Sequence, residues 1–197
     1  MGARRWEQEA VKYLTKEEVE RLFEEISDTR DLLLFDLTYR HGLRGNEAAH
    51  LTLDDFRDGR IWVARLKNGV SRAYRLHPRS ALLLRRYLAV RRDDGSPYLI
   101  RSRRRTQTPI SRGEINRLFH KYAQAAGLPR DRSHAHTLRH SIAVHLAEIG
   151  WDAAAVQHWL GHRSIASTMV YFRITEKRAE ALQRAMHRSR GIARTGR

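Results

Sequence analysis

The chain has 197 residues, with 38 lysines and arginines against 22 aspartates and glutamates, and a formal net charge of +16 at pH 7. This length fits one well-buried core, because domains usually contain about 100–200 residues. Such a positive charge indicates a polyanionic partner, since each phosphate that lysine or arginine neutralises releases condensed counterions. Charge alone is equally compatible with a basic protein of the ribosomal type.

The sequence contains no cysteine, which excludes disulfides, thiolate zinc sites and cysteine nucleophiles and is typical of a reducing cytoplasm. The first six residues are not followed by the apolar segment of a signal peptide. No stretch approaches the roughly 18 apolar residues that a membrane helix needs. We therefore expect a cytoplasmic, nucleoid-associated protein without a membrane partner.

The N-terminal part of the chain predicts three helices. Thr15 and Glu18 form a capping-box pattern, after which apolar residues recur on one helical face (Val19, Leu22, Phe23 and Ile26). A second helix is expected over about 30–42, and a short third helix over 44–51. Arg44 is therefore expected at the joint between two helices.

A β-hairpin is predicted next. Residues 61–67 and 70–76 read as strands on either side of Asn68-Gly69, a strong hairpin signal because both turn residues must accept positive φ. Lys67 would then occupy the last strand position before the turn.

The middle of the chain combines helices with a basic loop. An arginine-rich helix is expected over about 78–92, and another is expected after the capping-box pattern of Ser111 and Glu114. Between them lies the basic segment 101–105. This segment is interpreted either as a patch for a nucleic-acid backbone or as a solvated run of charge.

The C-terminal third is helical by pattern. Apolar residues at helical spacing predict a helix over 138–150, and Asp152 can cap another that ends at Gly161. A short helix is expected over 164–172, and a separate last helix from Thr175. The basic end, 188–197, is expected to be disordered.

The order of certain side chains suits attack on a phosphodiester. That bond breaks if a side-chain oxygen attacks phosphorus, two guanidinium groups take up charge on the nonbridging oxygens, and an acid protonates the leaving alcohol. Arginine suits the second task because its planar fork matches phosphate. The candidates are Arg44 and Arg139 as the pair of guanidinium groups, Tyr171 as nucleophile, Lys67 as acid, and His136 and His162 as hydrogen-bonding or proton-transfer groups.

Each candidate also has a plainer interpretation. Tyr171 alone reads as a half-buried tyrosine on an amphipathic helix, and Arg44 can pair with Glu47 three positions later. Lys67 can serve solubility, and His162 can cap a helix C-terminus. A zinc site among His134, His136, His140 and His145 is a further alternative, which we set aside because Arg139 is a cationic neighbour and no cysteine or nearby carboxylate completes the site.

The ordered set resembles the tyrosine recombinases of the phage integrase family. The matching residues are His136-x-x-Arg139-His140, Leu160-Gly161-His162, Tyr171 nine positions later, and Gly42-Leu43-Arg44-x-x-Glu47, with Lys67 on the family's hairpin lysine. The resemblance implies a mainly helical fold with a small antiparallel β-sheet. It divides the chain into a basic arm (1–12), a catalytic domain (13–174), and a C-terminal helix and tail (175–197).

The resemblance also implies a mechanism. Tyr171 would form a 3′-phosphotyrosyl link and release a 5′-hydroxyl, so that neither a metal ion nor another cofactor is required. Glu47 and His140 would support the site, and Arg65, Arg101, Arg103, Arg104 and Arg105 would contact DNA. The implied partners are double-stranded DNA with inverted-repeat sites, further copies of the chain in a tetramer on DNA, and accessory DNA-bending proteins.

Two departures from the family pattern bear on the function. Few residues precede the first expected helix, so the family's usual DNA-clamping domain looks absent, and the chain resembles the short recombinases that invert fimbrial promoters. Asn46 stands where serine is common. Two alternatives stay open: a type IB topoisomerase-like enzyme that relaxes DNA, and a DNA-binding regulator without strand exchange.

Overall fold

Helix α2 (Thr29–Arg40) lies at the centre of the fold and packs against helices on several sides, including α4 and α6. Its first turn is capped by Asp28, whose side chain accepts a hydrogen bond of 3.0 Å from the Asp31 amide. Apolar side chains at successive positions are buried (Leu33, Leu34, Phe35 and Leu37). Asp31 and Asp36 are buried as well, each in an ion pair with an arginine. Helix α2 is therefore enclosed on most sides, and the other elements are arranged around it.

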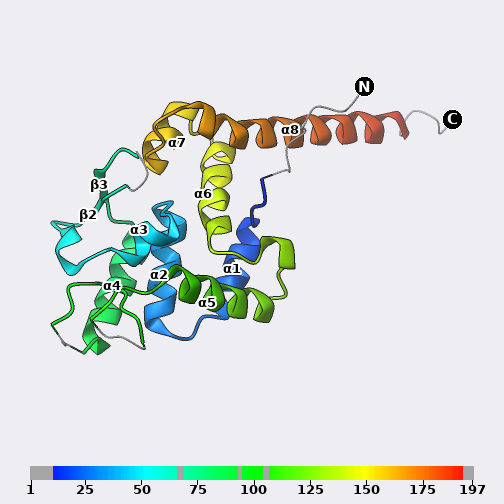
Figure 1. Ribbon diagram of the computed structural model, residues 1–197. Helices are drawn as coiled ribbons and strands as arrows, with labels where there is room; N and C mark the ends of the chain where they lie inside the picture. Colours follow the sequence, from blue (N-terminus) through cyan, green and yellow to red (C-terminus); the bar gives the residue numbers. More distant parts are fainter. Residues whose placement is uncertain (1–10, 66–68, 93–94, 104–106, 193–197) are drawn as a thin grey trace, which may run out of the picture.

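The computed structural model describes residues 11–65, 69–92, 95–103 and 107–192. It is mainly helical with one small antiparallel sheet, as expected (Figure 1). The other helices are α1 (Lys16–Glu24), α3 (Gly45–Ala49), α4 (Pro78–Val90), α5 (Arg112–Ala125), α6 (His136–Glu148), α7 (Ala153–Leu160) and α8 (Ala166–Ile192), with 3-10 turns at Leu53–Asp55 and Arg130–Arg132. No helix within these ranges is long and apolar enough to cross a membrane.

Local capping signals place most helix ends where the sequence predicts them. Thr15 and Glu18 form the full capping box of α1. Asp152 caps α7, and Gly161 ends it in the left-handed conformation at φ +64°. At α5, Ser111 accepts from the Glu114 amide at 3.1 Å. These contacts involve residues only a few positions apart, which is why the sequence alone reveals them.

The sheet differs from the predicted hairpin. Strands β1 (Phe56–Arg57), β2 (Arg60–Val63) and β3 (Arg72–Arg75) pair antiparallel in the order β1-β2-β3. A two-residue turn at Asn68-Gly69 would place Ile61 opposite Leu76, but Ile61 lies opposite Tyr74. Within the described residues, pairing ends at Val63 and Arg72. Asn68 of the predicted turn lies outside the described residues.

The last helix is continuous where two helices were expected. Helix α8 runs without interruption over Ala166–Ile192, passes through Thr175, and extends away from the rest of the molecule (Figure 1). Thr175 does not cap a new helix, because its hydroxyl donates to the Phe172 carbonyl at 2.8 Å within the same helix. The expected disorder over 188–197 is therefore wrong for 188–192, and 193–197 lie outside the described residues.

Two apolar clusters hold the body together. The larger gathers the buried side chains of the N-terminal helices, the sheet, α4 and α5, and the smaller lies between α6, α7 and the start of α8. The turn between α2 and α3 meets the smaller cluster at Gly42. A Cβ atom there would lie 2.5 Å from Leu160 Cδ2. The site described below is built around this turn.

We predict that Gly42→Ala destabilises the protein more than Gly127→Ala. Both glycines have positive φ, +56° and +66°, so each alanine carries a backbone cost of about 1–2 kcal/mol. Only Gly42 faces a buried side chain, and overpacking there adds about 1–3 kcal/mol. Chemical denaturation of both variants measures the difference. Equal free energies of unfolding would contradict the close contact.

Candidate active site

The carboxylate of Glu47 lies at the centre of three arginines. Its side chain is buried, and it forms ion pairs with Arg44 at 2.6 Å, Arg65 at 2.7 Å and Arg139 at 3.7 Å. We call these four residues the arginine cluster. One negative charge against three positive charges leaves a net charge of +2 within the cluster. Burial raises the pKa of Glu47, but Arg65 and the contacts with Arg44 and Arg139 outweigh this and hold it below its usual value.

Arg44 is the exposed member of the cluster. It lies at the joint between α2 and α3, where its amide donates to Glu47 Oε2 at 2.8 Å and its guanidinium donates to Oε1 at 2.6 Å. Its side chain is 27% exposed. The capping interaction of α3 thus orients a guanidinium group that still reaches solvent.

Arg139 lies on α6 and is almost fully buried, with 1% of its side chain exposed. Its two terminal nitrogens donate to the carbonyls of Gly42 and Leu160, the latter at 2.9 Å. Burial lowers the pKa of Arg139 to about 9, and Arg44 and Arg65 add to the effect. The group keeps its charge at neutral pH, so Arg139 contributes a fixed positive charge held by the backbone.

Arg65 does not occupy the position that its predicted DNA contact requires. Its side chain is 0% exposed, and both terminal nitrogens are bonded inside the protein. The expectation failed because sequence gives no sign of burial for an arginine, and arginines are mostly exposed.

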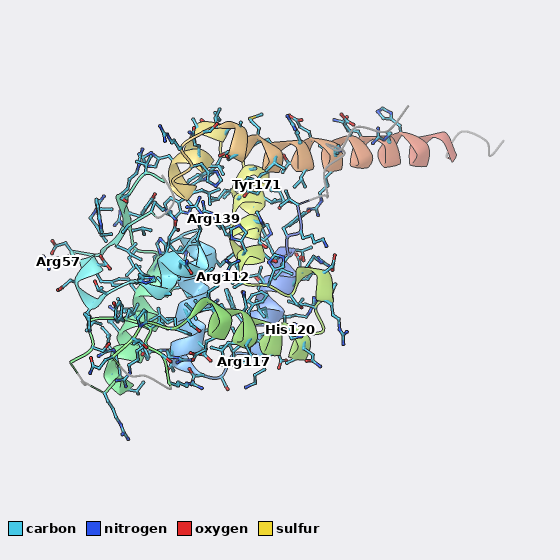
Figure 2. The ribbon with its side chains drawn as sticks, in the orientation of Figure 1. Arg57, Arg112, Arg117, His120, Arg139 and Tyr171 are labelled. Atoms are coloured by element: carbon cyan, nitrogen blue, oxygen red, sulfur yellow. The ribbon has the colours of Figure 1, made fainter. Side chains whose placement is uncertain are left out.

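Tyr171 on α8 lies between two histidines, near Arg139 (Figure 2). Its hydroxyl is 3.0 Å from His140 Nδ1, and the His162 ring stacks parallel to the tyrosine ring with centroids 6.5 Å apart. His162 Nδ1 in turn lies 2.9 Å from the Thr168 hydroxyl. His136 is one turn from His140 on α6, with ring centroids 4.5 Å apart. The structure therefore brings the predicted histidines, arginines and tyrosine together.

The histidines next to Tyr171 are neutral at physiological pH. Burial, aided by the positive charge of Arg139, lowers the pKa of both His140 and His162 to about 3. The pKa of His136 is also lowered, by partial desolvation and Arg139, but this residue keeps one exposed side. Burial raises the pKa of Tyr171, and Arg139 and Arg44 oppose the rise. The site thus holds a protonated phenol next to uncharged imidazoles.

The remaining predicted residues are Lys67 and the basic segment 101–105. Lys67, Arg104 and Arg105 lie outside the described residues. Arg103 pairs with Asp28 at 2.5 Å, and the Arg101 carbonyl accepts from Arg30 at 3.1 Å. Both contacts are at the N-terminal end of α2. Its 12 residues span about 18 Å, so this loop is a helix length away from the Gly42 end.

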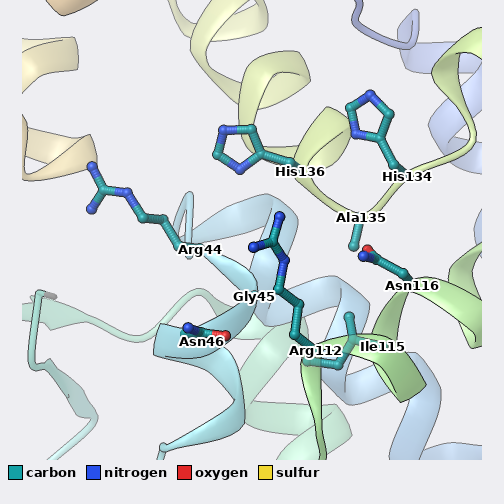
Figure 3. A pocket seen from close by; sticks show the side chains of 9 residues that line it. All are labelled: Arg44, Gly45, Asn46, Arg112, Ile115, Asn116, His134, Ala135 and His136. Atoms are coloured by element: carbon teal, nitrogen blue, oxygen red, sulfur yellow. The ribbon is translucent and has the colours of Figure 1, made fainter. Parts of the chain in front are cut away.

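A pocket of about 500 Å³ opens next to the cluster. Arg44 and His136 line one part of it, and the exposed Asn46, Arg112 and Asn116 line another. Figure 3 shows the Arg112 side chain extending from α5 toward His136. Sequence reasoning noted Asn46 only as a departure from the family pattern. It did not select Arg112 or Asn116, because nothing in their spacing separates them from the chain's many other polar residues.

The arrangement can bind and polarise a phosphodiester. The cluster carries a net positive charge, Arg44 reaches the pocket, and a tyrosine oxygen lies close by. Within the described residues, no group of three or more histidine, aspartate or glutamate side chains is placed to share a metal ion.

Known proteins resemble this chain over most of its length. The sequence pattern of the Phage integrase family matches residues 12–178. Tyrosine recombinase XerA of Pyrococcus furiosus is 37% identical over 180 residues, which cover 88% of this chain and 62% of XerA. Type 1 fimbriae regulatory protein FimE of Escherichia coli K12 is 33% identical over 170 residues, 81% of this chain and 84% of FimE. The chain thus spans less than two thirds of XerA.

Solved structures share the fold. The XerH site-specific recombinase, bound to a palindromic difH substrate in a post-cleavage complex, superimposes with a TM-score of 0.78. The match covers 92% of this chain and 55% of XerH at 24% sequence identity. The expected fold, mainly helical with a small antiparallel sheet, is confirmed by this similarity.

Stability should fall as the pH drops below about 6.5. His41 is 1% exposed with both ring nitrogens unpartnered, and burial, with nearby His77 and Arg65, lowers its pKa to about 3. Between these values the unfolded chain binds a proton that the folded chain does not, which costs about 2 kcal/mol of stability from pH 7 to pH 5. His41→Phe should remove this part of the pH dependence in chemical denaturation.

The control is His120→Phe, because His120 is exposed on α5 (Figure 2). It should keep the pH dependence of the wild type. An unchanged pH dependence in His41→Phe would show that His41 is not the buried neutral group described.

Proposed function

The chain belongs to the phage integrase family, and from this we propose that it is a site-specific DNA recombinase that cleaves and rejoins DNA through Tyr171. One observation carries the proposal. The hydroxyl of Tyr171 lies next to a buried cluster of net charge +2, while the histidines that contact the tyrosine are neutral. Positive charge held by arginine suits the nonbridging oxygens of a phosphodiester.

The proposed cleavage step forms one bond and breaks another. The Tyr171 oxygen bonds to phosphorus, the bond to the 5′-oxygen breaks, and a 3′-phosphotyrosyl link remains. His140, which is 3.0 Å from the hydroxyl, can accept the phenolic proton in the tautomer that leaves Nδ1 free. Arg44 and Arg139 offset the charge that develops on the nonbridging oxygens. Lys67 remains our candidate for protonating the 5′-oxygen.

Tyr171 must become accessible before it can attack. Only 3% of the residue is exposed, so its hydroxyl cannot meet a phosphate in the present arrangement. The hydrogen bond to His140 and the stacking on His162 hold it in place. We propose that DNA binding moves the start of α8 enough to open the hydroxyl toward Arg44, while His140 stays within hydrogen-bonding distance to accept the proton.

Double-stranded DNA is the proposed substrate. The net charge of +16 favours it. The partly exposed Arg44 and the exposed Asn46, Arg112 and Asn116 line the pocket on the same side as the cluster. Arginine and asparagine are the side chains that most often pair with guanine and adenine edges. We further propose inverted-repeat sites, a tetramer of chains on DNA, accessory bending proteins and a cytoplasmic, nucleoid-associated location.

Tyr171→Phe should abolish covalent linkage and leave DNA affinity nearly unchanged. The substitution removes the attacking oxygen but keeps the buried ring. Wild type and variant would be incubated in EDTA with nicked suicide duplexes tiled from DNA beside the gene, and the denaturation-resistant protein–DNA band would be measured. An adduct formed by the variant would overturn the nucleophile assignment. DNA binding by the wild type without an adduct would favour the regulator alternative, and supercoil relaxation by dilute protein would favour the topoisomerase alternative.

Arg44→Ala and Arg139→Ala should each slow adduct formation by on the order of 10²-fold or more, by analogy with the loss of an oxyanion donor. The control is Arg57→Ala, which removes the same charge from an exposed position far from Tyr171 (Figure 2). The rate of adduct formation would be measured in a single turnover at saturating DNA. Rates within a few-fold of Arg57→Ala would refute the paired-arginine mechanism.

A further inference from the structure

Arg65 is a buried arginine of the cluster that the proposed cleavage step does not use. Its side chain is 0% exposed, yet it lies one ion pair away from each guanidinium group that the proposed function uses. We propose that Arg65 is a positioning residue for DNA cleavage, which holds Glu47 and the Gly42 carbonyl so that Arg44 and Arg139 face the same phosphate. This inference rests on the proposed function.

The first support is the set of hydrogen bonds made by the guanidinium fork. One terminal nitrogen donates to Glu47 Oε2 at 2.7 Å and to the Gly42 carbonyl at 3.2 Å. The other donates to the Trp159 carbonyl at 2.9 Å and to the His41 carbonyl at 3.3 Å. Arg65 therefore joins α3, the turn after α2, and the end of α7. Lysine cannot replace these contacts, because it has one nitrogen in place of a planar fork.

The second support is that each of the other two arginines shares an acceptor with Arg65. Glu47 Oε2 accepts from Arg65 and from the Arg44 amide, while Oε1 accepts from the Arg44 guanidinium. The Gly42 carbonyl accepts from both Arg65 and Arg139. Loss of the fork would therefore free the carboxylate that orients Arg44 and one of the carbonyls that hold Arg139.

The third support is the packing around the arginine side chain. A Cβ atom on Gly161 would lie 2.8 Å from Arg65 Nε, and one on Gly69 would lie 2.6 Å from Arg65 Cβ. The Val70 amide donates to the Gly161 carbonyl at 3.3 Å across this contact. Arg65 is thus enclosed between the β2–β3 connection and the end of α7, directly before His162. The enclosure fixes the fork in one orientation.

The position of Arg65 predicts a specific kinetic signature. A residue that never reaches the surface should not change the dissociation constant for DNA, whereas a residue that orients the paired arginines should change the rate of the chemical step. A residue that contacts DNA would change both. The cleavage rate and the DNA affinity therefore separate the two roles.

The test compares Arg65→Lys with wild type and with Arg57→Lys, an exposed control for the same substitution. Lysine keeps a positive charge opposite Glu47, so the variant should fold, and thermal unfolding checks this. We expect the single-turnover rate of adduct formation to fall by about 10–100-fold, as for a misplaced catalytic group, with DNA affinity within about three-fold. Arg57→Lys should match the wild type in both measurements.

A double variant tests whether Arg65 acts through Glu47. In protein that already carries Glu47→Gln, adding Arg65→Lys should slow adduct formation by no more than a further factor of about two. The reason is that the effects of two residues acting through one contact are not additive. Full multiplication of the two effects would overturn the proposed route. The inference would also be overturned if Arg65→Lys formed the adduct at the wild-type rate, or if the variant lost cleavage rate and DNA affinity in parallel.

A substrate with a 5′-bridging sulfur tests whether Arg65 instead helps to protonate the leaving 5′-oxygen. A thiolate leaves without protonation, so this substrate repairs only defects in the leaving-group acid. We expect no recovery of the Arg65→Lys rate, and recovery would assign Arg65 to leaving-group protonation and overturn the inference. If wild type forms no Tyr171-dependent adduct, the proposed function and the inference fail together. If wild type forms the Tyr171-dependent adduct and Arg65→Lys forms it at the same rate, the inference fails and the proposed function stands.

Discussion

The site depends on one buried carboxylate. Without Glu47, the guanidinium groups of Arg44, Arg65 and Arg139 would repel one another where water is scarce and charge interactions are strong. Buried ion pairs contribute little to stability, since the cost of removing the charges from water can exceed their attraction. The proposed function offers another reason for the cluster, because its two excess positive charges would be offset by a bound phosphodiester.

The fold brings this cluster together at a single turn. The Gly42 carbonyl accepts from Arg65 and Arg139, although these residues come from segments after β2 and on α6. The positive φ of Gly42 and its contact with Leu160 allow α2, α3 and α7 to approach closely there. The turn at Gly42 therefore has two roles: it packs against Leu160, and its carbonyl accepts hydrogen bonds from two arginines of the cluster.

Signals between residues a few positions apart predict most of the helices and strands. Features that depend on contacts between distant parts of the chain are not predicted. The capping residues of α1 and α7 act within a few positions, so their helices start where expected. The register of the hairpin depends on cross-strand partners outside the turn, which the turn sequence does not specify. Thr175 could either cap a new helix or lie inside a continuous one, and it lies inside α8. The order of the catalytic candidates predicts the cluster around Tyr171, but not Arg65, because only the tertiary fold pairs that arginine with Glu47. Lys67 remains a prediction.

The electrostatics also bear on how Tyr171 would lose its proton in the proposed cleavage step. Arg139 and Arg44 oppose the rise that burial imposes on the pKa of Tyr171. A bound phosphate would offset their positive charge, and this would remove the interaction that favours the phenolate. Substrate binding thus makes prior ionisation of Tyr171 harder. In the proposed mechanism, proton transfer then accompanies attack on phosphorus, with the neutral His140, 3.0 Å from the hydroxyl, as the acceptor.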